Sequence, residues 1–132
     1  MPKGIFKDSG LAHYLQGIST KDQLHVSPHV GTGFESFIIE EVIKGLESLL
    51  LTGWHYYYYR TRNGAEVDLI IEGNFGILPI EIKYGMDVKL KQLTSLKRFV
   101  TENNLPFGIV INNSEEVMML TENVIQIPAG LV

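Results

Sequence analysis

Three strand-forming runs, separated by two short turns, follow one another between residues 54 and 84 and restrict the fold more than any other feature of the sequence. The first turn is Asn63-Gly64, and both residues tolerate the positive φ angles that a two-residue hairpin requires. The second turn, residues 73–76, contains two glycines. We therefore expect an antiparallel meander with strands over residues 54–62, 65–72 and 77–84.

Helical and strand patterns flank this meander. Apolar side chains recur with helical spacing over residues 32–51 and again over residues 87–102. A fourth strand is expected over residues 107–112, and a closing hairpin over residues 117–127. Residues 1–30 are expected to be irregular, with a short helical piece near residues 10–15, and residues 31–132 to form the domain. The order predicts an α/β fold in which helices cover a mixed sheet with an added C-terminal hairpin.

Composition narrows the class of protein. The chain has 132 residues, of which 45% are hydrophobic, as in a single globular domain. No apolar run approaches the ~20 residues of a membrane helix, and the N-terminus has no secretory apolar region. Cysteine is absent, so disulfides and thiolate chemistry are excluded, and we expect a cytoplasmic protein. The net charge of -4 argues against coating nucleic acid by bulk charge, but leaves a local basic rim open.

One carboxylate interrupts the apolar face of the first predicted helix. At about 100° per residue, with Phe34 at zero, the apolar side chains occupy roughly 40° to 180° and Glu35 lies near 100°. Glu40 and Lys44 fall on the opposite, polar face. A carboxylate directed at a core is costly unless it is paired, protonated or bound to a cation. Thr32 and Glu35 also match a capping box, and Glu35 could serve both roles.

Charged residues also interrupt the second and third predicted strands. Because side chains alternate along a strand, Glu81 and Lys83 are expected to share one face, and Asp68 to lie on the face opposite Val67 and Leu69. The two strands should pair as antiparallel neighbours, which brings Asp68 near Glu81 or Lys83. One interpretation is a cross-strand ion pair between Asp68 and Lys83 on a solvated face. The other is a shared acidic site.

These residues resemble the motif of the PD-(D/E)xK nuclease superfamily. Asp68 matches the first acid, Glu81 and Lys83 match the E-x-K that follows across a hairpin, and Glu35 matches an acid on the preceding helix. Val67 stands where the proline of the motif would be. The resemblance implies a restriction-endonuclease-like αβββαβ core and a hydrolase that cleaves phosphodiester bonds in DNA, with RNA also open. It further implies that the three acids bind Mg²⁺, or Mn²⁺, and that Lys83 orients the attacking water.

Longer stretches resemble the C-terminal domain of a family of bacterial and archaeal AAA-type ATPases. These stretches read IFKDSGLAHYL, GTGFESFIIEEV, YYYRTRNGAEVDLIIE and PIEIKYG. In that family a nuclease-like domain follows an ATP-binding domain and a winged-helix segment. The sequence contains no G-x-x-x-x-G-K-[ST] phosphate loop of its own. The resemblance therefore implies an ATPase domain of a longer chain as partner, and leaves a non-catalytic module that binds DNA or a partner protein as the alternative to a nuclease.

Four further residues are weaker candidates for contact with nucleic acid. Arg60 and Arg62 flank the Asn-Gly turn, and Lys89 and Gln92 begin the second predicted helix near the end of the third strand. Each also suits a solvated surface position. The tyrosines at 56–59 could stack on bases, although aromatic residues are ordinary strand formers. The closing hairpin also offers an edge that could pair between chains.

Overall fold

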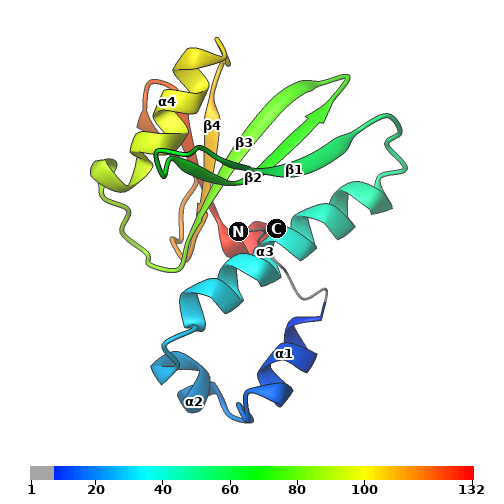
Figure 1. The fold of residues 1–132 in the computed structure, drawn as a ribbon, viewed down its shortest axis with the longest axis vertical. Helices are drawn as coiled ribbons and strands as arrows, with labels where there is room; N and C mark the ends of the chain where they lie inside the picture. The colour runs from blue at the N-terminus through cyan, green and yellow to red at the C-terminus, as the bar shows by residue number, and fades with distance from the viewer. Residues whose placement is uncertain (1–7) are drawn as a thin grey trace.

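A six-stranded mixed sheet lies at the centre of the computed structural model, which describes residues 8–132 (Figure 1). The strand order is β1-β2-β3-β4-β6-β5. The first three strands form the expected antiparallel meander, β4 is parallel to β3, β6 is parallel to β4, and β5 is antiparallel to β6. The bounds are β1 His55–Arg60, β2 Glu66–Gly73, β3 Gly76–Lys83, β4 Gly108–Asn112, β5 Met118–Thr121 and β6 Val124–Pro128.

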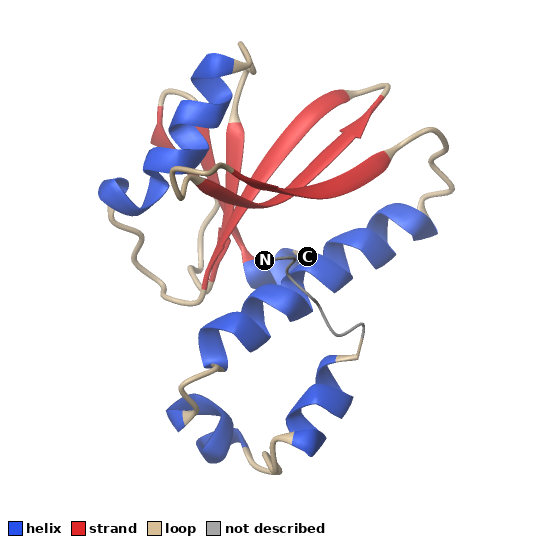
Figure 2. Cartoon of the chain, in the orientation of Figure 1, coloured by secondary structure: helices blue, strands red, loops and turns tan. Residues whose placement is uncertain are grey.

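Helices cover both faces of the sheet (Figure 2). Alternate residues of β4 divide between two apolar clusters: Val110 packs with α4, whereas Ile111 packs with α3. α1 and α2 lie on the side of α3 away from the sheet. The bounds are α1 Ser9–Leu15, α2 Lys21–Val26, α3 Val30–Ser48, η1 Leu90–Leu93, α4 Thr94–Glu102 and η2 Ala129–Leu131. Within residues 8–132, none of these helices combines the length and apolarity needed to cross a membrane.

The structure confirms the α/β class, the meander and the closing hairpin, and it corrects the start of the first long helix. α3 begins at Val30, two residues after Pro28. The N-cap residue is His29, whose side chain makes no capping bond. Glu35 therefore lies beyond the first turn, and the capping box predicted for Thr32 and Glu35 is wrong.

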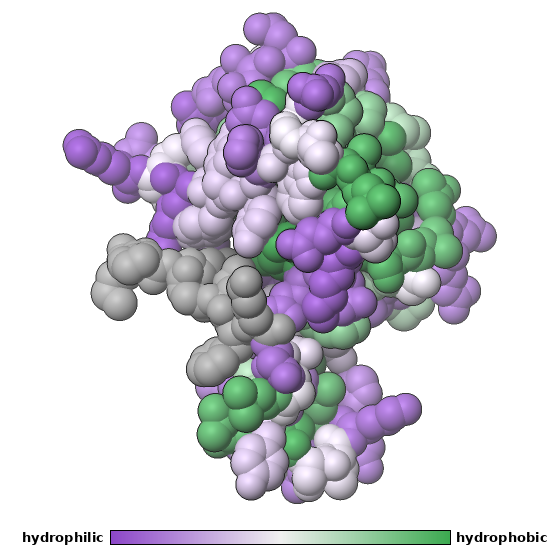
Figure 3. Space-filling view, turned by 90° about the vertical axis from the view of Figure 1, so that its right-hand side faces the viewer, coloured by the Kyte–Doolittle hydropathy of each residue, from purple (hydrophilic) through white to green (hydrophobic). Residues whose placement is uncertain are grey.

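The same helix ends earlier than predicted. α3 stops at Ser48, and the three leucines that follow, Leu49, Leu50 and Leu51, are exposed on the loop to β1 instead of completing the apolar stripe. This loop lies at the right of Figure 1, on the side that Figure 3 turns toward the viewer, where hydrophobic side chains gather beside hydrophilic ones.

Two other helical predictions also change. Residues 87–89 are not helical, because the Lys89 N–H donates to the Gln92 side chain and a 3-10 turn precedes α4. The N-terminal segment contains α2 as well as the expected piece near residues 10–15. A capping box between Thr20 and Gln23 starts α2, and this pattern was readable in the sequence.

Candidate active site

A β-bulge in β2 positions Asp68. Tyr57 of β1 pairs with Ile70 of β2, and Tyr59 pairs with Val67. One residue of β1 between these pairs therefore lies opposite two residues of β2, Asp68 and Leu69. Val67 consequently packs in the cluster beneath α4, whereas Leu69 packs in the cluster beneath α3. The prediction that Val67 and Leu69 share a face is wrong. Bulges re-aim side chains and are frequent beside functional sites.

The re-aimed carboxylate of Asp68 reaches the backbone of β3. The ladder between β2 and β3 runs from the turn to the pair of Leu69 with Ile80. Beyond that pair, the Ile82 N–H donates to Asp68 Oδ2 at 2.8 Å, in the position where a strand carbonyl would otherwise accept. Asp68 is only 7% exposed, so this charge-assisted bond fixes its side chain between the two strands.

Glu81 and Lys83 extend together from β3, as the alternation predicted. Ile80 and Ile82 pack in the apolar cluster beneath α3, and Glu81 and Lys83, at the alternate positions of β3, lie on the other side of the strand. Lys83 Nζ donates to Glu81 Oε1, so the ion pair joins residues of one strand. Glu81 is 6% exposed, and its second oxygen, Oε2, is buried with no hydrogen-bond partner among residues 8–132.

Electrostatic coupling links the four predicted residues. The pKa of Glu81 is raised to about 7: burial is the largest cause, the charges of Asp68 and Glu35 also raise it, and the hydrogen bond and charge of Lys83 oppose them. Burial lowers the pKa of Lys83, but the hydrogen bond and charge of Glu81, with the charges of Asp68 and Glu35, outweigh it and raise that pKa overall. Glu35, half-buried on α3, therefore acts on both residues of the ion pair.

The carboxylates offer a cation an incomplete set of ligands. Within residues 8–132, no three His, Cys, Asp or Glu side chains are arranged to hold one metal ion, so Glu35, Asp68 and Glu81 do not form a ready three-ligand site. Mg²⁺ commonly binds through one or two carboxylates and completes its shell with water and substrate phosphate. Asp68 and Glu81, with the unpartnered Oε2 of Glu81, fit that requirement.

The residues predicted to contact nucleic acid have local partners or lie in a turn. Arg60 Nε lies 3.9 Å from Glu66 Oε2, across the β1–β2 ladder. Arg62 is exposed in the turn that follows. The Gln92 side chain accepts from the Lys89 N–H at 2.8 Å, which places both residues in a local cap. Their contact with nucleic acid stays a prediction.

Contacts that the sequence did not indicate anchor the end of β3. Tyr84, directly after Lys83, has its hydroxyl 2.8 Å from His25 Nδ1 of α2 and its ring 5.4 Å from that of Phe34 on α3. Asn113 Nδ2 donates to the Tyr84 carbonyl. These contacts hold the backbone next to Lys83. His25 and Tyr84 are 59 residues apart in the chain, which explains why local patterns did not find them.

A buried amide network continues this anchor. Asn112, fully buried at the end of β4, donates from Nδ2 to the Met86 carbonyl at 2.9 Å and to Gln126 Oε1 at 3.1 Å. Ser114 Oγ donates to Asn112 Oδ1. Buried amides are stabilising when their partners are in place, so this network fixes the loop that leaves β3.

The structure also corrects the position of Glu40. The helical arithmetic places it on the polar face of α3, yet it is only 9% exposed. Glu40 Oε2 lies 3.6 Å from Lys44 Nζ, and Oε1 is buried without a hydrogen-bond partner in the described part of the chain. Helical periodicity sorts side chains by polarity and therefore did not predict the burial of Glu40.

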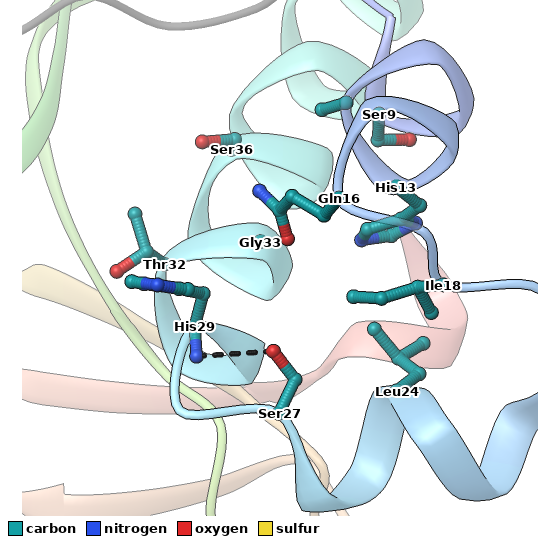
Figure 4. A pocket seen from close by; sticks show the side chains of 11 residues that line it. Ser9, His13, Gln16, Ile18, Leu24, Ser27, His29, Thr32, Gly33 and Ser36 are labelled. Carbon is teal, nitrogen blue, oxygen red and sulfur yellow. Dashed lines mark hydrogen bonds between the residues drawn. The ribbon is translucent and has the colours of Figure 1, made fainter.

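A small cavity of about 140 Å³ lies between α1, α2 and the first turns of α3 (Figure 4). His13, Gln16 and Ser36 are among the residues that line it, and the His29 N–H donates to Ser27 Oγ at its edge. Among residues 8–132 no carboxylate lines it, so it is separate from the cluster formed by Asp68 and Glu81.

Comparison with known proteins identifies the family. The chain is 28% identical over 131 residues to the uncharacterized protein Mb2031c of Mycobacterium bovis (strain ATCC BAA-935 / AF2122/97) and equally to the uncharacterized protein Rv2008c of Mycobacterium tuberculosis (strain ATCC 25618 / H37Rv). Each alignment covers 99% of this chain and 28% of the relative, so the chain spans little more than a quarter of these curated relatives. A sequence profile described as Domain of unknown function (DUF4143) matches residues 30–132, and the chain belongs to that family.

Proposed function

We propose that this domain is a divalent-cation-dependent nuclease of the PD-(D/E)xK type, which hydrolyses phosphodiester bonds in DNA, with RNA as the alternative substrate. The observation that carries the proposal is the burial of two carboxylates, Asp68 and Glu81, on adjacent strands beside the ammonium group of Lys83. Two buried like charges are costly, and the raised pKa of Glu81 reports that cost. A bound cation would offset it.

Each residue has a defined role in this proposal. Asp68 and Glu81 would hold Mg²⁺, or Mn²⁺, and Glu35 would contribute its negative charge from α3. The ion would polarise the scissile phosphate and lower the pKa of a water molecule. Lys83 would orient the attacking water and stabilise the negative charge that develops on the phosphate. Before a cation binds, the same ammonium favours the ionised form of Glu81.

The arrangement of the elements supports the same proposal. From α3 to β4 the order is helix, three strands, helix and strand, which matches the αβββαβ core of that superfamily. We further propose that the domain acts in the cytoplasm, attached to an AAA-type ATPase in a longer chain. The greater length of the mycobacterial relatives is compatible with this association.

Two observations favour a second function, a nuclease-fold module that binds DNA or a partner protein without cleaving it. Lys83 is already engaged with Glu81, and no three-ligand group is preassembled within residues 8–132. A site in which Lys83 stays bound to Glu81 and no cation is held would keep the architecture of a nuclease without its activity.

Cleavage of supercoiled plasmid, linear DNA and RNA, with Mg²⁺ or Mn²⁺, tests the proposal. Asp68→Asn retains an oxygen that can accept from the Ile82 N–H but removes the charge, and we expect a loss of rate of about a hundredfold or more. Glu47→Gln, at an exposed position on α3, is the matched control and should cleave like the wild type. Equal activity of the wild type and Asp68→Asn would contradict the mechanism. Binding of DNA without cleavage would support the second function.

A further inference from the structure

The edge strand β5 presents an apolar, partly exposed surface. Among the described residues β5 pairs only with β6, and it forms one border of the sheet. Met118 is 48% exposed and Met119 is 53% exposed. An edge strand offers backbone N–H and C=O groups to an added strand, and methionine side chains adapt to partners of varied shape.

A groove runs beside this edge. Its volume is about 370 Å³, and apolar side chains from the loop after β3 and from β5 line it, namely Met86, Val88, Met118 and Leu120. Both walls are held in place: Asn112 donates to the Met86 carbonyl, and Gln126 Nε2 donates to the Glu116 carbonyl at 3.2 Å. The groove is therefore formed before any partner arrives.

The rim of the groove is acidic. Asp87, Glu115 and Glu116 line it, and no Lys, Arg or His among residues 8–132 does. Glu122 is exposed just beyond the other end of β5. In an antiparallel pair of two β5 strands, Glu115 and Glu116 of each copy would approach Glu122 of the other, and like charges opposite one another are destabilising. The charge pattern thus disfavours a second copy and complements a basic segment.

We propose that β5 and this groove bind an extended segment of a partner protein that is apolar at its centre and flanked by Lys or Arg. The segment would add a strand at β5, place apolar side chains in the groove and pair its basic ends with the acidic rim. This binding is independent of the proposed nuclease activity.

Selection from a displayed random peptide library tests the proposal, with the wild type and a Glu115→Lys/Glu116→Lys variant as parallel targets. The wild type should enrich peptides with apolar centres and an excess of Lys and Arg over Asp and Glu. The charge-reversed variant should lose that excess and bind the recovered peptides about tenfold more weakly. Failure to enrich any peptide, or the same enrichment on both targets, would overturn the proposal.

The recovered peptides then locate the binding surface. Met118→Ser should weaken their binding, whereas Leu50→Ser, at an exposed leucine elsewhere on the molecule, and Asp68→Asn should not. Equal effects of Met118→Ser and Leu50→Ser would contradict binding at β5. Sedimentation of the wild type as a dimer that Met118→Ser dissociates would also overturn the proposal, because a second copy would then cover the edge.

Discussion

Glu81 is the residue whose ionisation the fold resists most clearly. One carboxylate oxygen accepts from Lys83, the other is buried without a partner among the described residues, and Asp68 adds a second negative charge from the neighbouring strand. Burying Glu81 beside a second carboxylate carries a desolvation cost, and Glu81 Oε2 recovers none of that cost through a hydrogen bond to the described residues. This cost is the physical reason to assign the cluster to function.

The pH dependence of stability follows from the raised pKa of Glu81. The native side chain takes up a proton near pH 7, whereas the ordinary value is 4.5, so the native state binds more protons between these values. The stability that Glu81 contributes is therefore complete below about pH 4.5 and is lost as the pH rises through 7. Without divalent cations, wild type should lose on the order of 3 kcal/mol relative to Glu81→Gln across this range.

Urea unfolding of wild type, Glu81→Gln and the exposed control Glu47→Gln at several pH values measures this difference. Glu47→Gln should track the wild type at every pH. A free energy of unfolding that differs by a constant amount between wild type and Glu81→Gln from pH 4.5 to 8 would show that Glu81 has no raised pKa.

Lys83 is expected to affect both the ionisation of Glu81 and the chemistry. Lys83→Met removes the hydrogen bond and the positive charge that lower the pKa of Glu81, so that pKa should rise above its wild-type value. An NMR titration of the Glu81 carboxyl carbon checks this. The rate of DNA cleavage by Lys83→Met, measured at a pH above the Glu81 pKa of both proteins, should fall about a hundredfold. Lys44→Met, an exposed lysine paired on α3, is the control, and an unchanged pKa in Lys83→Met would refute the coupling.

At the scale of elements, the close approach of α4 to β4 holds the sheet beneath the site. Gly108 begins β4, and a Cβ there would lie 2.9 Å from Leu96 Cδ1 and 3.0 Å from Val100 Cγ2. Both of these side chains are buried on α4. The absence of a side chain at Gly108 therefore sets the distance between the helix and the strand.

Gly108→Ala should destabilise the fold by about 1–3 kcal/mol, because overpacking displaces α4. Gly45→Ala is the matched control: its Cβ would meet no atom within 4 Å on α3, and it should stabilise the helix by about 0.5–1 kcal/mol. Denaturant unfolding compares the two. A Gly108→Ala variant as stable as Gly45→Ala would show that the contact is not tight.

Local chemistry predicted most of these elements, and long-range contacts account for the failures. The Asn63-Gly64 turn and strand alternation predicted the meander, and alternation correctly placed Glu81 and Lys83 on one side of β3, although the ion pair weighed for Lys83 was with Asp68 and the structure shows one with Glu81. Strict alternation failed in β2, because the bulge at Asp68 depends on pairing with β1. Periodicity likewise misplaced Glu40, which is buried although the helical pattern assigned it to the polar face of α3.

At the scale of the whole molecule, the sheet order separates two surfaces with different chemistry. β3 lies inside the sheet between β2 and β4, and it carries the Glu81–Lys83 pair on an element anchored on both sides. β5 lies at the border and leaves its outer edge to a partner. Tyr84 connects the site to α2 and α3, so the N-terminal helices and the sheet share one set of contacts around the end of β3.

Binding of a divalent cation by the whole domain tests the central claim most directly. Titration with Mn²⁺ at pH 8, followed by electron paramagnetic resonance, should show one saturable site that Mg²⁺ displaces. Asp68→Asn and Glu81→Gln should each weaken it by about tenfold or more, and Glu115→Gln, in the separate acidic groove, should leave it unchanged. No saturable binding by the wild type, or equal affinity in Asp68→Asn, would contradict the account.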